Sequence, residues 1–385
     1  LVTREGLTGI RVIRAFNRVE WERERFDQAN LDLTENAIRV NRLMATLMPS
    51  MMLIMNLTIV AIIWFGSVRI DNNDMQIGSL MAFIQYSMQI MVSLIMVSVM
   101  FIMIPRASAS AVRINEVLDT VPEIKDAAPA ERGTAATGRG HLEVREVTFS
   151  FPGAEQPTLK DISFKAEPGQ ITAIIGGTGS GKSTLISLIP RFYDIDQGQI
   201  LIDGVDIRRM TQADLRSRIG FVPQRAVLFT GTVAENIRLG KEDATEEEVR
   251  RAAETAQAME FISEMKEGFD SIIEQGGTNL SGGQKQRLAI ARALVRRPEI
   301  YIFDDSFSAL DFKTDARLRQ ALKTETAGST VLIVAQRAAT VMRADQIIVL
   351  DEGRMVGHGT HAELMRDCEV YREIVYSQLS EEELA

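Results

Sequence analysis

Two segments of the sequence carry residues whose types and spacing suit the binding of phosphate and magnesium. In the first, ITAIIGGTGSGKSTLISLI, the pattern G-x-x-x-x-G-K-[ST] is filled by Gly176, Gly181, Lys182 and Ser183. Glycines allow consecutive backbone N–H groups to surround a phosphate, the lysine neutralises the outer phosphates, and the serine hydroxyl binds magnesium. We therefore predict a nucleotide-binding loop formed by Gly176, Gly177, Thr178, Gly179, Ser180, Gly181, Lys182, Ser183 and Thr184.

The second segment, IYIFDDSFSALD at residues 300–311, places two aspartates directly after an apolar run. A magnesium ion on nucleotide phosphates needs a carboxylate at the end of a neighbouring strand, and Asp304 has that position. Asp305 would then face the water that attacks the terminal phosphate, as a base or an orienting group. The alternative is that both acids are solvated turn residues. We predict Ser183 and Asp304 as magnesium ligands and Asp305 as a catalytic residue.

The surrounding segments predict the elements that must hold these residues. HLEVREVTFSF and TLKDISFKA alternate like strands on either side of a turn at Pro152-Gly153. ITAIIG then reads as a buried strand that leads through the glycine-rich loop into a helix, and IYIFD reads as a second buried strand. These patterns predict an α/β domain over residues 141–385.

The first third of the chain has the composition of membrane spans. Residues 43–68 contain no charged residue, and about 26 residues at 1.5 Å each give a helix of roughly 39 Å, which is enough to cross a bilayer. Residues 76–105 form a second uncharged stretch. The alternative, a pair of buried helices in a soluble protein, requires two long uncharged segments in succession, which soluble cores seldom supply. We predict two spans.

The charges that flank the spans predict their orientation. Arg39 and Arg42 precede the first span and Arg106 and Arg113 follow the second, whereas the short connection RIDNNDM has one arginine and two aspartates. Both ends of this hairpin therefore face the cytoplasm. Residues 1–42 are expected to form a cytoplasmic helical segment and residues 106–118 a cytoplasmic extension. Residues 119–140, rich in proline, glycine and small residues, are expected to be a linker.

One face of the second span carries methionines at helical spacing, namely Met81, Met88, Met96 and Met103. Flexible thioethers suit a surface that binds ligands of many shapes. The alternative is that the stripe serves helix packing or lipid contact.

The overall composition excludes several classes of protein. A net charge of −9 and the lack of a long basic block argue against nucleic-acid binding. The single cysteine, Cys368, rules out an intramolecular disulfide framework and is typical of a reducing compartment. No basic and apolar leader precedes Leu1, so we expect no signal peptide and a start that lies further upstream.

Between the two chemical segments lies NLSGGQKQRLAIARALVRRP, and its LSGGQ at residues 280–284 resembles the signature of ATP-binding cassette proteins. Residues 141–385 as a whole resemble such a cassette, with an α-helical subdomain. GIRVIRAFNRVEWERERF at residues 9–26 resembles the intracellular coupling loop of exporter-type half-transporters. The two spans resemble the fifth and sixth of six, which implies that four spans and roughly 180 residues precede this chain. The expected fold is a membrane helical bundle fused to an α/β P-loop cassette.

The resemblance implies further binding roles. Phe151 stands where an aromatic residue stacks on adenine, and Gln224, in FVPQ, where a glutamine senses magnesium and the membrane domain. Residues 308–311, SALD, match a loop that crosses a dimer interface. A helix that begins at the signature presents N–H groups and a hydroxyl to an anion, which in the family is the ATP of the other cassette. The implied signature ligands are Ser281, Gly282, Gly283 and Gln284.

The sequence also departs from the family pattern at the expected hydrolytic site. Asp305 stands where competent cassettes have Glu, and Gln336 where they have His. An aspartate withdraws the carboxylate by about 1.5 Å, and misplacement of that order costs roughly a hundredfold in rate. Gln336 cannot carry the charge of an imidazolium. A further departure places Gln275 and Gly276 where Glu and Arg are common, which leaves the coupling to the membrane helices open.

The resemblance and these departures together predict one half of a dimeric ATP-driven exporter in the inner cell membrane, with ATP and Mg²⁺ as cofactors. The partner is expected to be a different chain, so that this chain's own ATP site is slow and its signature completes the partner's site. The alternative is a homodimer that uses Asp305. Amphipathic small molecules are the expected cargo, with lipid or peptide export and a non-transporting cassette ATPase as alternatives.

Overall fold

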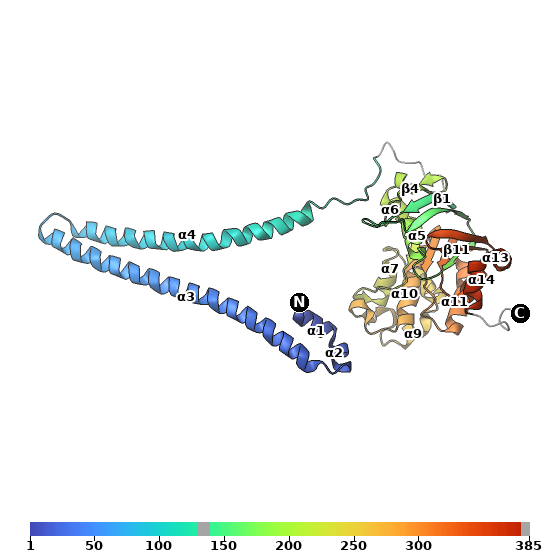
Figure 1. Ribbon diagram of the computed structural model, residues 1–385, viewed down its shortest axis with the longest axis horizontal. Coiled ribbons are helices and arrows are strands. Elements are labelled where there is room, and N and C mark those ends of the chain that lie inside the picture. The colour runs from blue at the N-terminus through green and yellow to red at the C-terminus, as the bar shows by residue number, and fades with distance from the viewer. Residues whose placement is uncertain (129–138, 379–385) are drawn as a thin grey trace. The chain divides into compact units, whose positions relative to one another are not determined.

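The computed structural model describes residues 1–128 and 139–378, which fall into two compact units, residues 1–121 and 122–385 (Figure 1). The first unit is entirely helical within the described residues. Two short helices, α1 (Val2–Thr8) and α2 (Ile10–Ala15), precede two long ones, α3 (Val19–Asp71) and α4 (Ile77–Leu118). A short turn joins α3 to α4, so the two lie side by side as an antiparallel hairpin.

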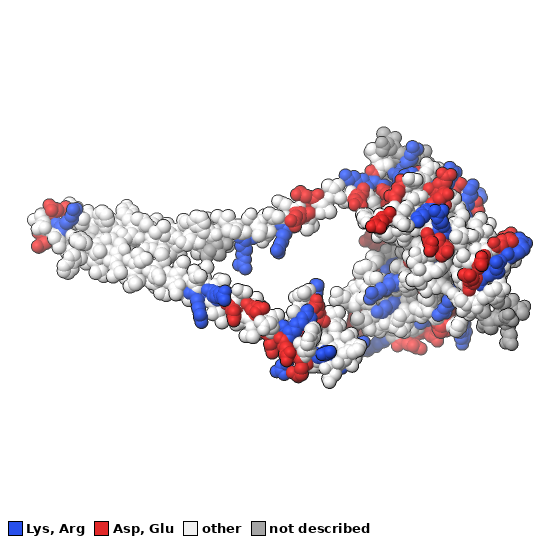
Figure 2. All heavy atoms as spheres, in the orientation of Figure 1, with Lys and Arg blue, Asp and Glu red and all other residues white. Residues whose placement is uncertain are grey.

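α3 contains the first predicted span, 43–68, and α4 contains the second, 76–105, except for residue 76, which is its N-cap. A core helix of a soluble protein would be mostly buried, but the most apolar windows of α3 and α4 are 6% and 0% buried. Figure 2 shows the middle of the hairpin free of acidic and basic side chains, which gather towards its ends. Such a surface requires an apolar solvent. The structure therefore favours membrane helices over the soluble alternative.

Hydroxyl groups within the spans obtain their hydrogen bonds locally. Serine and threonine side chains donate to the carbonyl four residues earlier, as Thr58 does to Ile54, Ser67 to Ile63, Ser93 to Gln89 and Ser98 to Leu94. A bilayer core contains no water that could accept these hydrogen bonds instead. These hydroxyl groups are therefore compatible with lipid.

The second unit is built on a six-stranded sheet with the order β12-β11-β3-β10-β9-β6. Its strands are β3 (Ile171–Gly176), β6 (Ile219–Val222), β9 (Ile300–Asp304), β10 (Thr330–Val334), β11 (Gln346–Asp351) and β12 (Arg354–Gly359). Five strands run parallel and β12 is antiparallel to its neighbour. Parallel strands end at one edge of a sheet, so the residues that follow β3, β6, β9 and β10 meet there.

The sheet is covered on both faces, which explains its continuous apolar strands. Ala173 and Ile175 of β3 belong to one buried core, whereas Ile174 belongs to the other. The helices that pack around it include α5 (Lys182–Leu188), α6 (Gln212–Ser217), α11 (Phe312–Glu325), α12 (Ala338–Val341), α13 (His361–Asp367) and α14 (Glu369–Tyr376). The α/β architecture predicted from the sequence is confirmed.

Two smaller parts complete the second unit. A four-stranded antiparallel sheet contains β1 (Leu142–Phe149), β2 (Leu159–Ala166), β4 (Gln197–Ile202) and β5 (Val205–Asp206). A helical part between β6 and β9 contains α7 (Val233–Arg238), α8 (Glu246–Thr255), α9 (Met259–Glu264), α10 (Gly282–Val295) and the short strands β7 (Gly231–Thr232) and β8 (Ile272–Ile273). This is the expected helical subdomain.

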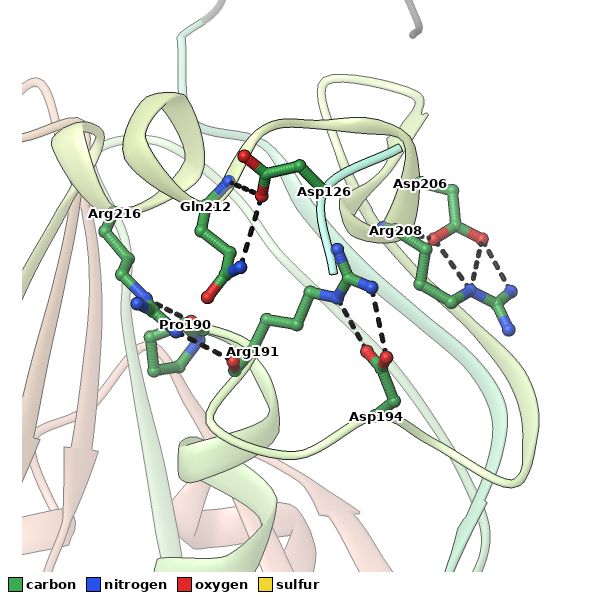
Figure 3. A network of polar contacts seen from close by, with 8 residues as sticks. All are labelled: Asp126, Pro190, Arg191, Asp194, Asp206, Arg208, Gln212 and Arg216. Carbon is green, nitrogen blue, oxygen red and sulfur yellow. Dashed lines mark hydrogen bonds and ion pairs between the residues drawn. The ribbon is translucent and has the colours of Figure 1, made fainter. Parts of the chain in front are cut away.

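The chain that enters the second unit is fastened to α6 (Figure 3). Asp126 accepts hydrogen bonds from the backbone N and the Nε2 of Gln212, at 2.9 and 3.2 Å. Arg216, one turn further along α6, donates to the carbonyls of Pro190 and Arg191, which follow the helix α5. The predicted linker 119–140 therefore has at least one contact point on this unit, and its residues 129–138 lie outside the described residues.

A second fastening holds residues 139–141, where the predicted domain begins. The carboxylate of Asp203 accepts hydrogen bonds from the backbone N–H groups of residues 139, 140 and 141, at 3.2, 3.4 and 3.0 Å. Arg218 forms ion pairs with both Asp203 and Glu299. The Asp203 side chain is 9% exposed, so these partners replace water as the source of its hydrogen bonds.

Replacement of Asp203 by Ala should therefore destabilise the second unit by about 2 to 3 kcal/mol, because it leaves two partly buried N–H groups and the largely buried Arg218 guanidinium with fewer partners. Thermal unfolding of the full-length protein, followed by the transition of this unit, measures the effect. Asp196→Ala, which removes an exposed carboxylate, is the control and should leave the midpoint unchanged. Equal midpoints for the two variants would show that the fastening contributes nothing.

Candidate nucleotide site

The glycine-rich loop between β3 and α5 has the backbone conformation that the motif predicts. Gly179 and Gly181 have φ of +84° and +96°, which residues with a Cβ rarely adopt. At Gly181 an added Cβ would also lie 2.7 Å from the Leu159 side chain. The loop therefore needs glycine both for its turn and for its close approach to β2, and Gly181 forms the N-cap of α5.

Lys182 is buried within this loop. Its Nζ donates to the carbonyl oxygens of Gly176 and Gly177, at 2.9 and 2.6 Å, and the side chain is 8% exposed. Burial lowers the pKa of the ammonium group, while the charges of Asp304 and Asp305 oppose this shift. The structure thus holds a cation inside a glycine-rich loop at the beginning of a helix, which is an arrangement that suits an anionic ligand.

Ser183 and Asp304 come together although 121 positions separate them in the sequence. The Oγ of Ser183 donates to Oδ1 of Asp304 at 3.1 Å. The strand order brings them into contact, since β10 lies between β3 and β9 and pairs Val334 with both Ile174 and Asp304. Burial raises the pKa of Asp304, whereas the hydrogen bond from Ser183 lowers it.

Asp305 follows on the same edge of the sheet in a left-handed conformation, with φ of +44°. Its Oδ2 accepts a hydrogen bond of 3.4 Å from Nε2 of Gln224, which comes after β6. The buried Ser306 hydroxyl donates to the carbonyls of Val222 and Asp304 and so connects the ends of the two strands. The second aspartate thus has one side-chain contact at this edge of the sheet, with Gln224, and is partly exposed.

Gln336 lies two residues after β10 and is exposed. The neighbouring Arg337 reaches towards the loop after β9, where its Nη2 donates to the carbonyl of Ser308 at 3.4 Å. A cavity of about 10 Å³, which leaves room for one water at most, is lined by Asp305, Ser308 and Arg337 of these loops and by residues of α11 and α12. The loops that carry Asp305 and Gln336 are thus in direct contact.

Phe151 belongs to an aromatic group at the end of β1. Its ring centroid lies 5.0 Å from that of Phe149 and 5.3 Å from that of Tyr193, and both contacts are edge-on. Phe151 is 37% exposed, so part of its ring remains available for stacking. The neighbouring Thr158, which donates its N–H to the Phe149 carbonyl, lies beside Gly181 of the glycine-rich loop.

The signature residues form the beginning of α10. Ser281 is the N-cap, and its Oγ accepts a hydrogen bond from the N–H of Gln284, whose side chain accepts one from the N–H of Ser281. This capping box uses the Gln284 side chain and two donors within the helix itself. Among the described residues, the N–H groups of Gly282 and Gly283 have no hydrogen-bond partner, so these two donors are available to an anion.

The structure therefore separates the predicted site residues into two places. The glycine-rich loop, Asp304, Asp305 and Gln224 meet at one edge of the large sheet, with Gln336 on the loop after β10. Ser281 to Gln284 begin a helix of the helical subdomain, where a Cβ added at Gly283 would lie 3.1 Å from the Ala309 carbonyl oxygen and 3.6 Å from the Leu310 side chain. Sequence reasoning missed Tyr193, although the aromatic pair Phe192-Tyr193 shortly after the glycine-rich loop was a signal for it.

The residues at the sheet edge fit a magnesium ion that is shared with nucleotide phosphates. Ser183 and Asp304 already lie within hydrogen-bond distance of each other, and Gln224 lies against the neighbouring Asp305. Among the described residues there is no group of three or more His, Cys, Asp and Glu side chains that could hold a metal by themselves. An ion bound here would take its remaining ligands from phosphates and water, which is how magnesium is usually held.

Comparisons with known proteins agree with this architecture. A family model described as ABC transporter transmembrane region matches residues 1–94, and one described as ABC transporter matches residues 159–308. An uncharacterized ABC transporter ATP-binding protein of Mycobacterium bovis is 46% identical over 98% of this chain and 65% of its own length. An ATP-dependent lipid A-core flippase of Pseudomonas putida is 39% identical over 94% of this chain and 60% of its own length.

A solved structure, that of a bacterial Atm1-family ABC exporter with ATP bound, superimposes with a TM-score of 0.86 at 31% identity, over 99% of this chain and 66% of that one. The chain thus spans about 60 to 66% of the length of these proteins. The family models place both a transmembrane region and an ATP-binding domain on one polypeptide, as the two units of the structure do. The chain belongs to the ABC transporter family, as an exporter-type chain that joins a transmembrane region to an ATP-binding cassette.

Proposed function

We propose that this protein couples ATP hydrolysis to export across the cell membrane as one half of a dimeric ABC transporter. The observation that carries the proposal is the contact between Ser183 of the glycine-rich loop and Asp304, in a chain that also holds a membrane hairpin. In the proposal, this pair would bind magnesium beside the nucleotide phosphates at the edge of the sheet. The unit that contains it would lie in the cytoplasm, because arginines flank both ends of the hairpin.

In this proposal each part of the site has a role. Lys182, which now donates to two loop carbonyls, would bind the outer phosphates, and the loop amides would surround them. Ser183, Asp304 and Gln224 would hold magnesium, which neutralises phosphate charge when bound. Phe151, with Tyr193 beside it, would stack on the base. Asp305 would orient the attacking water, with Gln336 near the terminal phosphate.

The second half of the transporter would contribute a signature helix to this site, and Ser281 to Gln284 would do the same for the partner. The free N–H groups of Gly282 and Gly283 support this role, because they form an anion site at the beginning of a helix of 14 residues. Gln284 would act through its capping of the helix rather than as a direct ligand in the conformation described here.

We further propose that the partner is a different chain and that this chain's own ATP site is slow. Asp305 and Gln336 replace the glutamate and histidine expected at their positions, and both changes weaken the same step. The alternative, a homodimer that uses Asp305, is supported by the contact of this carboxylate with Gln224. The two alternatives differ in whether the protein hydrolyses ATP by itself.

For the cargo we propose amphipathic small molecules, with the exposed methionines of α4 as part of the binding surface. Lipid is a second candidate, because relatives at 38 to 39% identity are named as lipid A-core flippases. Both candidates require an apolar surface in the membrane region.

The experiment that tests the proposed function uses the full-length protein in nanodiscs and in inside-out vesicles. Binding of a fluorescent ATP analogue with Mg²⁺ should be detected, and ATP-dependent accumulation of an amphipathic dye should occur once the partner is supplied. A panel of dyes, lipids and peptides, assayed by stimulation of ATP hydrolysis, distinguishes the cargo classes. Absence of nucleotide binding would overturn the proposal. If only lipids stimulated ATP hydrolysis, the proposed cargo would be lipid instead of amphipathic small molecules.

A further inference from the structure

The segment that carries Gln336 has few hydrogen bonds of its own. It connects β10, which ends at Val334, to the short helix α12, which begins at Ala338. Arg337 is the N-cap of α12, but its side chain forms no capping hydrogen bond. The first N–H groups of a helix have no partner inside the helix. The N–H of Ala338 therefore needs an acceptor from another part of the chain.

Gln378, forty residues later in the sequence, supplies that acceptor. Its Oε1 accepts a hydrogen bond of 2.7 Å from the N–H of Ala338, and its Nε2 donates one of 2.8 Å to the carbonyl of Gln336. One side-chain amide thus binds the backbone on both sides of Arg337. Two hydrogen bonds from one planar group fix orientation as well as distance.

The position of Gln378 is itself set by a well-packed helix. Gln378 follows α14 by two residues, and its own N–H donates to the carbonyl of Val375. Within α14 the side chains of Tyr371 and Val375 are fully buried, in the core that also contains Ala173 and Ile175 of β3. The amide of Gln378 is therefore held relative to the strand that leads into the glycine-rich loop.

The contacts continue from this segment to the loop that carries Asp305. Arg337 donates to the Ser308 carbonyl, and the Ser308 hydroxyl donates to the carbonyl of Asp305 at 2.9 Å. Asp305, Ser308 and Arg337 also line one small cavity, so a shift of residues 336–338 would act on the Asp305 loop through these contacts.

We propose that Gln378 is a positioning residue for hydrolysis, which holds residues 336–338 so that Gln336 and the Asp305 loop keep their places at the terminal phosphate. This role rests on the proposed ATPase function and adds to it a contribution from the carboxyl-terminal helix. Gln378 touches neither nucleotide nor magnesium. It acts through the backbone of Gln336 and Ala338.

The test compares Gln378→Ala and Gln378→Glu with the control Ser377→Ala in the full-length protein. Ser377 is also exposed, but its hydroxyl donates to Ile374 of its own helix. Gln378→Ala removes both hydrogen bonds, and Gln378→Glu keeps an acceptor for Ala338 but loses the donor to Gln336. The measurements are kcat and KM for ATP, binding of a fluorescent ATP analogue, and hydrogen exchange of residues 335–341. Each variant is also prepared with Asp305→Glu and Gln336→His, so that a slow site does not hide the effect.

Gln378→Ala should lower kcat by about tenfold, as expected when catalytic groups are misplaced, with KM and analogue binding unchanged and faster exchange at Ala338. Gln378→Glu should lower kcat to a similar degree, and Ser377→Ala should match the parent protein. Unchanged kcat in Gln378→Ala, with or without faster exchange, would overturn the positioning role. A parent protein that fails to bind the analogue would overturn the proposed function itself, which is a separate result.

Discussion

The double replacement Asp305→Glu and Gln336→His should raise the ATP turnover of the full-length protein, assayed without a partner, by on the order of a hundredfold. The longer side chain moves the carboxylate forward by about one methylene, towards the position that the water must occupy. The imidazole adds a group that can carry positive charge beside the terminal phosphate. Both positions lie on loops that are in contact through Arg337 and Ser308, so the two changes act on the same site.

The measurement is steady-state release of phosphate by the protein in nanodiscs. A matched control makes the same chemical changes at exposed positions, Asp196→Glu and Gln320→His, and should leave turnover unchanged. The single replacements, Asp305→Glu and Gln336→His, show how much of the gain in turnover comes from the carboxylate and how much from the imidazole. An unmodified protein that already hydrolyses several ATP molecules per second by itself would contradict the proposal of a slow site and favour the homodimer with Asp305 as a working residue.

Replacement of Lys182 by Met should weaken nucleotide binding and, in the protein that carries Asp305→Glu and Gln336→His, lower ATP turnover by on the order of 10² to 10³, the size found when one preorganised donor to a transition state is removed. Lys182 is a buried cation within the glycine-rich loop. Residues 176–184 contain no second lysine or arginine that could replace it. Methionine is unbranched and keeps most of the length of the side chain without its charge.

Binding of a fluorescent ATP analogue and phosphate release, measured on the same preparation, check this prediction. The control is Lys323→Met, which removes an exposed lysine of α11 and should retain both activities. Since Lys182 also bonds to the carbonyls of Gly176 and Gly177, a thermal unfolding midpoint close to that of the parent is needed to show that the loop still folds. Full activity of Lys182→Met would contradict the proposed phosphate site.

The elements of the fold were predictable where the signal is local. The glycine-rich loop requires left-handed glycines within a few residues, and the spans require unbroken apolar sequence, so both follow from short segments. The ends of the long helices did not follow in the same way. Hydropathy predicted spans at 43–68 and 76–105, whereas α3 begins at residue 19 and α4 continues to residue 118, at the ends away from the turn that joins them. Hydropathy indicates only the part of a helix that lies in the apolar core of a membrane. Each helix continues beyond that part through charged residues, whose helix propensity is as high as that of the apolar residues.

The sequence by itself determined the family of this protein, the residues that could bind phosphate and magnesium, and the presence of two membrane helices, because each depends on residues that are neighbours in the chain. Only the tertiary structure decided which of these residues meet. The order of strands β3, β10 and β9 brings Ser183 to Asp304, and the packing of α14 brings Gln378 to Ala338. Such contacts depend on strand order and on the burial of distant side chains, which short-range patterns do not encode.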